Sequence, residues 1–263
     1  MATVTAPTVS PILICPEWPV PASVIALVTT RGGGVSKAPF NTFNLALHVN
    51  DEPADVLANR AILQEHLEQD LDLQWLQQVH GTEVVQAGRN AGEKRGDAVF
   101  IDQPGVAGVV MTADCLPVFF AALDGSSVAV AHAGWRGLAD GILERTLETF
   151  SVSPAEIICW MGPAIGPCHF EVGVEVRDVF LNACVDDTQR REMLRVAFRL
   201  SSESGKFHAD LYSLARLRLQ QCGVVGIHGG GFCTHCDAER FFSYRREQDT
   251  GRMASVIGLK KFS

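Results

Sequence analysis

The sequence lacks the features that mark several large protein classes. Its 263 residues contain no run rich in lysine and arginine, and 22 basic against 30 acidic residues give a net charge of -8. Proteins that bind duplex nucleic acid usually carry a basic patch, so we expect no nucleic-acid partner. No apolar stretch approaches the roughly 18 residues of a transmembrane helix, and the first residues do not resemble a signal peptide. We therefore expect a cytoplasmic protein with no membrane partner.

Several common catalytic motifs are also missing. The chain has no Walker phosphate loop, no Gly-x-Gly-x-x-Gly, no His-Glu-x-x-His and no Gly-x-Ser-x-Gly. These absences argue against P-loop enzymes, dinucleotide-binding enzymes, zincin proteases and α/β-hydrolases. The eight histidines form no His-x-His pair. This argues against a true multicopper oxidase, whose copper sites need many imidazole ligands.

The eight cysteines are scattered along the chain, and some lie inside apolar runs, as Cys159 does. This distribution fits free thiols in a reducing compartment better than a disulfide framework. Cys233 and Cys236 have the C-x-x-C spacing of a metal or redox pair. No second pair is evident to complete a structural zinc site, so we expect no second metal centre.

Apolar runs typical of strands dominate the sequence, and several are nearly all apolar, which indicates strands buried on both faces. Helical patterns cover residues 51–67, 138–150, 174–183 and 211–220. Strands and helices without strict alternation predict an α/β or α+β sandwich. We expect one domain over 23–263 behind an N-terminal extension over 1–22. The predicted strands cover 23–29, 73–79, 98–101, 107–112, 118–123, 128–132, 156–161, 224–229 and 253–259.

Three short segments each end an apolar run with a good metal ligand, namely His80, Cys115 and His132. Each lies close to glycine or proline at the expected end of a strand, where α/β folds place their sites. Two imidazoles and one thiolate would leave the fourth position of a tetrahedral zinc ion open for water or substrate. The spacing is much wider than in a zinc finger, so the alternative is two ordinary histidines and a buried thiol.

Six ordered segments follow one another as in the laccase-domain family, and the chain resembles that family from about Val24 to Leu259. The resemblance implies a single-domain, layered α-β-β-α sandwich with mixed sheets, similar to the catalytic domain of a cytotoxic necrotising toxin. It also implies that His80, Cys115 and His132 bind zinc, which copper could replace at a nitrogen and sulfur site. The segments are TRGGGVS at 30–36, QVHG at 78–81, ADCLPV at 113–118, AHAGWRG at 131–137, GPAIGPC at 162–168 and FSYRR at 242–246.

The family carries an older label as multicopper polyphenol oxidase (laccase), and one branch is called peptidoglycan editing factor. The resemblance implies zinc-dependent phosphorolysis of purine nucleosides (adenosine, inosine, guanosine or methylthioadenosine), with adenosine deamination. We therefore expect a purine nucleoside and phosphate as small-molecule partners of a monomer. Three alternatives stay open: a Cys-His hydrolase or amidase that edits peptidoglycan precursors with Cys115 as nucleophile, a non-catalytic fold that zinc stabilises, and a copper polyphenol oxidase, which the histidines disfavour.

Phosphorolysis needs a cation to hold phosphate, and Arg31 beside three glycines is the first candidate. Arg136 and Arg245 are further candidates, and His48 could line the substrate pocket. Asp114 precedes the thiol and could carry a proton or orient a histidine, although strand alternation could point it away. A glycine-rich turn with a surface arginine is the alternative for Arg31.

Overall fold

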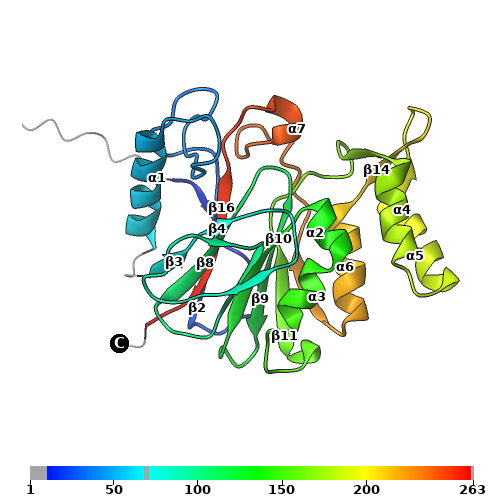
Figure 1. Ribbon diagram of the computed structural model, residues 1–263, viewed down its shortest axis with the longest axis horizontal. Helices are drawn as coiled ribbons and strands as arrows, with labels where there is room; N and C mark the ends of the chain where they lie inside the picture. Colours follow the sequence, from blue (N-terminus) through cyan, green and yellow to red (C-terminus); the bar gives the residue numbers. More distant parts are fainter. Residues whose placement is uncertain (1–10, 68–70, 262–263) are drawn as a thin grey trace, which may run out of the picture.

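The computed structural model describes residues 11–67 and 71–261, which form two β-sheets packed face to face with helices outside them (Figure 1). The first sheet has the strand order β1-β2-β16-β8-β3, and the second has the order β15-β11-β9-β10-β7-β5. The first comprises β1 (Leu13–Ile14), β2 (Val24–Thr29), β16 (Met253–Leu259), β8 (Val106–Thr112) and β3 (Asp72–Gln74). The second comprises β15 (Gly226–Gly229), β11 (Ile157–Met161), β9 (Leu116–Ala122), β10 (Val128–Ala133), β7 (Ala98–Ile101) and β5 (Val84–Gln86).

Both sheets are mixed because short parallel strands flank antiparallel centres. In the first sheet, β16 pairs antiparallel with β2 and with β8, while β3 pairs parallel with β8. In the second, β9 pairs antiparallel with β10 and with β11, while β15 and β5 are parallel to their neighbours. The strands β8 and β16 of the first sheet and β9 and β10 of the second are buried along their whole length. This explains why their sequences are continuous apolar runs.

Three hydrophobic cores separate four layers. Residues such as Phe119, Val130 and Ile257 fill the space between the sheets, whereas Phe120 points to the opposite face of the second sheet. That outer face is covered by α2 (Trp135–Asp140), α3 (Ile142–Leu147) and α6 (Leu211–Gln221), and α1 (Pro53–His66) covers the outer face of the first sheet. The expected α-β-β-α sandwich is confirmed.

A smaller unit extends the hydrophobic core on the outer face of the second sheet. It comprises α4 (Val174–Asn182), α5 (Asp187–Ala197) and an antiparallel sheet in the order β12-β14-β13. Its strands are β12 (Glu171–Gly173), β14 (Lys206–Ala209) and β13 (Phe198–Leu200). Elsewhere, β4 (Leu76–Gln77) and β6 (Lys94–Arg95) form a two-stranded sheet, and the short helix α7 (Tyr244–Glu247) precedes β16. The sequence did not predict α5, because charged residues outnumber apolar ones in it.

The structure refines several predicted boundaries. The helix expected over 138–150 is two helices, because Gly141 adopts the left-handed conformation between α2 and α3. The strand expected over 73–79 is divided into β3 and β4. The expected N-terminal extension ends inside the fold, since Leu13 and Ile14 pair with β2, while residues 1–10 lie outside the described residues. Within the described ranges, no helix has the length and hydropathy needed to cross a membrane.

Candidate metal centre and its pocket

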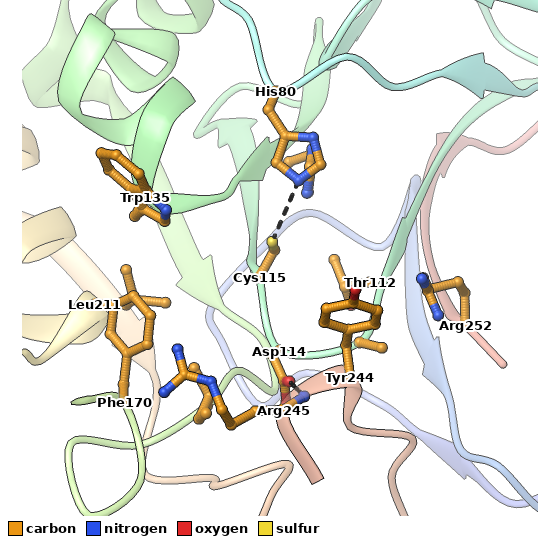
Figure 2. A pocket seen from close by; sticks show the side chains of 13 residues that line it. His80, Thr112, Asp114, Cys115, Trp135, Phe170, Leu211, Tyr244, Arg245 and Arg252 are labelled. Atoms are coloured by element: carbon orange, nitrogen blue, oxygen red, sulfur yellow. Dashed lines mark hydrogen bonds between the residues drawn. The ribbon is translucent and has the colours of Figure 1, made fainter. Parts of the chain in front are cut away.

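The three predicted ligands meet at one end of the sandwich. His80 follows β4, Cys115 lies in the turn from β8 to β9, and His132 is on β10. Their ligand atoms all lie within 4.8 Å of one another, and the rings of His80 and His132 meet edge to face with centroids 4.7 Å apart. Figure 2 shows the Cys115 thiol pointing to the His80 ring, with 3.9 Å between Sγ and Nε2.

Asp97 organises two of these ligands from a fully buried position before β7. Its Oδ1 lies 2.9 Å from Nδ1 of His132, and its two oxygens accept hydrogen bonds from the backbone N–H groups of Val79, His80 and Gly81. Because Nδ1 of His132 faces the carboxylate, Nε2 is the nitrogen left for a ligand. A carboxylate behind a histidine is the usual partner that orients a metal-binding imidazole.

The backbone around the centre is held in unusual conformations. His80 and Asp114 have φ values of 60° and 95°, in the left-handed region that costs a non-glycine residue roughly 1–3 kcal/mol. Gly134 lies directly above the donors, because a Cβ there would be 3.0 Å from Cys115 Sγ and 3.0 Å from a carbon of the His80 ring. The sequence AHAGWRG therefore needs glycine at 134 to keep the space between the donors free.

The electrostatics of the three side chains favour a thiolate. Burial raises the pKa of Cys115, but the charge and hydrogen bonding of His132 and His80 outweigh it and lower that pKa to about 6. Burial lowers the pKa of His132, while Cys115 and Asp97 outweigh it and raise that pKa to about 9. Without a metal, the group is thus a thiolate beside an imidazolium. A metal cation would replace the imidazolium proton as the partner of the thiolate.

The donor set fits a bound metal ion. Two imidazole nitrogens and one thiolate, with both histidine rings held in place, are the protein ligands found in three-ligand zinc sites. The same donors also bind copper, so the side chains themselves do not choose between the two metals. The structure therefore supports a metal-binding group formed by His80, Cys115 and His132.

The centre opens into a cavity of about 240 Å³. Sites for drug-sized ligands usually measure roughly 300–1,000 Å³. This cavity is slightly smaller than that range, so it suits a small molecule. Trp135, Leu211 and Phe170 form one wall, and Tyr244 and Arg252 lie on the opposite side (Figure 2). The remaining lining residues are His80, Thr112, Ala113, Asp114, Cys115, His132, Ile165 and Arg245.

The structure separates the predicted phosphate ligands. Arg245, on α7, lines the cavity, and its Nη1 donates to the carbonyl oxygens of His169 and Glu171. Arg31 lies outside this cavity, where its Nη1 donates to Glu247 and to the carbonyl of Ala238. Arg136 is exposed and stacks on Trp135, and His48 is exposed, so neither lines the cavity.

Asp114 lines the cavity but does not orient a histidine. Its Oδ1 accepts a hydrogen bond from Thr234 Oγ1 at 2.6 Å, and its Oδ2 accepts one from the backbone N–H of Arg245 at 2.6 Å. The carboxylate therefore connects the turn before β9 to the loop at 234 and to α7. Asp97 takes the orienting position that the sequence offered as one role for Asp114.

Asp97 and Arg252 are charged residues of the site that the sequence analysis did not single out. Asp97 is a single acidic residue directly before an apolar strand, and its burial is the signal that only the fold reveals. Arg252 directly precedes β16, and burial lowers the pKa of its guanidinium, which the negative charges of Cys115 and Asp114 oppose.

A sandwich of two mixed sheets with a two-histidine, one-cysteine group in an end pocket defines the structural class. The family model described as multi-copper polyphenol oxidoreductase laccase matches residues 25–260, and the chain belongs to that family. A purine nucleoside phosphorylase of Pseudomonas aeruginosa is 51% identical over 94% of this chain and 98% of its own length. The purine nucleoside phosphorylase YfiH of Escherichia coli is 46% identical over 94% and 98%.

Solved structures agree with these relatives. The Neisseria meningitidis protein NMB0706 is 45% identical and superposes with a TM-score of 0.88 over 95% of this chain and 99% of its own. YlmD from Geobacillus stearothermophilus is 34% identical, with a TM-score of 0.82 over 91% and 93%. The expected family is thus confirmed, and its curated relatives carry the name of an enzyme.

The Asp97 contacts predict the effect of Asp97→Asn. One oxygen in place of two leaves buried N–H groups without an acceptor, so the free energy of unfolding should fall by about 1–3 kcal/mol. The affinity of the site for a metal ion, measured with zinc, should fall about 10- to 100-fold because His132 loses its orienting carboxylate. Thermal unfolding and a chelator competition measure the two effects. The control is Asp102→Asn, an exposed aspartate that accepts a hydrogen bond from Gln86; equal zinc affinity in both variants would contradict the role of Asp97.

Proposed function

We propose that this protein is a zinc-dependent purine nucleoside phosphorylase, with His80, Cys115 and His132 as the zinc ligands. The observation that carries the proposal is a set of three metal donors in a pocket that also contains two arginines and aromatic walls. The names of the curated relatives support the choice of substrate. The products would be a free purine base and ribose 1-phosphate.

Phosphorolysis sets three demands on the pocket. The bond from C1′ of the ribose to the purine nitrogen breaks, a bond from C1′ to a phosphate oxygen forms, and the departing base takes a proton. The pocket must hold phosphate close to C1′, keep the purine in place and stabilise the charges that develop during the reaction. When bound, a zinc ion supplies Lewis acidity in the pocket.

Arg245 and Arg252 meet the first demand. Each guanidinium donates hydrogen bonds from Nη1 to two backbone carbonyls, which fixes the side chain. Phosphate would bind at Nε and Nη2. A planar guanidinium group can donate two parallel hydrogen bonds to two oxygens of one phosphate. We propose these two residues as the phosphate site in place of Arg31 and Arg136.

Aromatic side chains meet the second demand. Trp135 and Phe170 lie on one side of the pocket and Tyr244 on the other (Figure 2), and these aromatic rings would pack against a flat purine. Thr112 also lines the pocket, and its buried Oγ1 has no hydrogen-bond partner among the described residues. A polar group of the substrate would supply that partner.

The remaining charged residues position these groups. Asp97 holds the His132 ring and the His80 backbone, so it keeps the nitrogen donors in place. Asp114 accepts from the Arg245 backbone and thereby sets the start of α7. We propose a positioning role for Asp114, and we propose that Cys115 acts as a metal ligand. The same pocket would support deamination of adenosine to inosine and ammonia as a second activity.

One observation favours a second candidate, a Cys-His hydrolase or amidase. Cys115, His132 and Asp97 follow one another in contact, and the lowered pKa of the thiol and raised pKa of the imidazole match an activated nucleophile with its base. In a metal-free protein, the Cys115 thiolate would attack the amide carbonyl of a peptidoglycan precursor, and the C–N bond would break as protonated His132 donates a proton to the departing amine. Water would then hydrolyse the thioester and release the acid and the free thiolate. This mechanism would need no phosphate, which separates it from phosphorolysis.

Product analysis tests the proposed function. Wild-type protein given adenosine and phosphate should form adenine and ribose 1-phosphate, detected by mass spectrometry, and should form inosine as a second product. Cys115→Ala should lose both activities, whereas Cys15→Ala, which removes an exposed thiol, should keep them. Full turnover by Cys115→Ala would contradict the proposal. Cleavage of a peptidoglycan precursor by chelator-treated wild type, with adenosine left intact, would favour the hydrolase.

Steady-state kinetics test the phosphate site. Arg245→Gln should raise KM for phosphate about 10- to 100-fold, since a hydrogen bond to a charged group contributes about 1.5–3 kcal/mol. Arg245→Lys keeps the charge and should lose less. Arg89→Gln is the matched control, because Arg89 is exposed and donates to the carbonyl of Pro104. A raised KM for nucleoside with an unchanged KM for phosphate would assign Arg245 to the nucleoside instead.

A further inference from the structure

A second group of metal donors lies beside the pocket. Cys168 and His169 belong to the loop that follows β11, and Cys233 and Cys236 belong to the loop that precedes α7. The four ligand atoms lie within 4.8 Å of one another. The sequence shows the Cys233–Cys236 pair, but its partner pair is more than sixty residues away, so the expectation of no second pair is wrong.

Three distances within this group come within about 0.3 Å of the edges of a tetrahedron around one zinc ion. Cys168 Sγ is 3.5 Å from Sγ of Cys233 and 3.5 Å from Sγ of Cys236, and Cys236 Sγ is 3.3 Å from Nδ1 of His169. Zinc bonds of about 2.3 Å to sulfur and about 2.0–2.1 Å to nitrogen would give edges of roughly 3.8 and 3.6 Å. A disulfide would require about 2.05 Å between sulfurs.

The surroundings are shaped for such a group. The backbone N–H of Gly166 donates to Cys233 Sγ at 3.3 Å, which suits a sulfur that carries negative charge. A Cβ on Gly166 would lie 3.1 Å from Cys233 Cβ and 3.4 Å from Cys168 Sγ, so glycine lets the loop approach both cysteines. The His169 ring stacks on His235 with centroids 3.8 Å apart, which fixes the ring with Nδ1 toward Cys236.

We propose that Cys168, His169, Cys233 and Cys236 bind a second zinc ion. Three thiolates and one imidazole fill a tetrahedral coordination sphere, and a site without an open position is structural. Each loop supplies two ligands: the loop before α7 supplies Cys233 and Cys236 in a C-x-x-C motif, and the loop after β11 supplies the adjacent Cys168 and His169. This site is distinct from the group formed by His80, Cys115 and His132.

The second zinc ion would fix the wall of the pocket. Phe170 lines the cavity directly after His169, and Arg245 donates to the carbonyl oxygen of His169. Thr234, between the two cysteines of the C-x-x-C pair, donates to Asp114. The ion would therefore join two loops that hold Phe170, Arg245 and Asp114 in place. The inference does not depend on which reaction the pocket performs.

Native mass spectrometry of protein purified in zinc-containing medium counts the bound ions. We expect two zinc ions per chain in the wild type and one in Cys233→Ser/Cys236→Ser. The control Cys15→Ser/Cys222→Ser changes two cysteines outside both groups and should keep two ions. Two ions in the Cys233→Ser/Cys236→Ser protein would overturn the proposal.

A second variant keeps the test decisive if loss of the two cysteines prevents folding. Cys115→Ala/His132→Ala removes two ligands of the pocket centre and leaves the second group intact, so it should retain one zinc ion and lose turnover. Zinc-free Cys115→Ala/His132→Ala protein would overturn the proposal, as would a mass lowered by two hydrogens that shows a disulfide in place of the ion. Failure of the phosphorylase assay would leave this zinc count unchanged.

Discussion

The buried carboxylate of Asp97 is the contact on which the site depends. It accepts hydrogen bonds from three backbone N–H groups of the segment that carries His80, and it lies against Nδ1 of His132. One side chain thus fixes candidate metal ligands from two separate parts of the chain. A buried charge is costly unless it is fully paired, and here every partner belongs to the site. The positive φ of His80 is held in the same way, because the carboxylate accepts the N–H groups on both sides of it.

The position of the site follows from the sandwich. β8 belongs to the first sheet and β9 to the second, so the turn between them crosses from one sheet to the other. This turn carries Cys115 into the same pocket as His132 of β10 and Arg252, which directly precedes β16. Asp114 links this turn to Thr234 and to α7, so one carboxylate connects the turn that carries Cys115 to the loop that carries Cys233 and Cys236. Polar contacts hold these loops together, and the two proposed metal ions would hold them further.

The layered fold was largely predictable because its strands are buried on both faces and appear as apolar runs; the strands at 98–101 and 253–259 are confirmed without change. Cys115 and the two histidines were predictable because each ends such a run within a family motif. Asp97, Arg252 and Cys168 were not, because their roles arise from contacts with residues far away in the sequence. Arg31 illustrates the converse: a glycine-rich segment suggested an anion site, but the fold pairs that arginine with Glu247.

Anomalous X-ray scattering from crystals grown without chelator tests the central claim most directly. Data collected above and below the zinc absorption edge would locate the ion and identify it in one experiment. We expect a zinc peak among His80 Nε2, Cys115 Sγ and His132 Nε2, with Asp97 behind the imidazole of His132. A copper signal there, or zinc-loaded crystals with no peak between these three side chains, would contradict a zinc centre at this end of the sandwich.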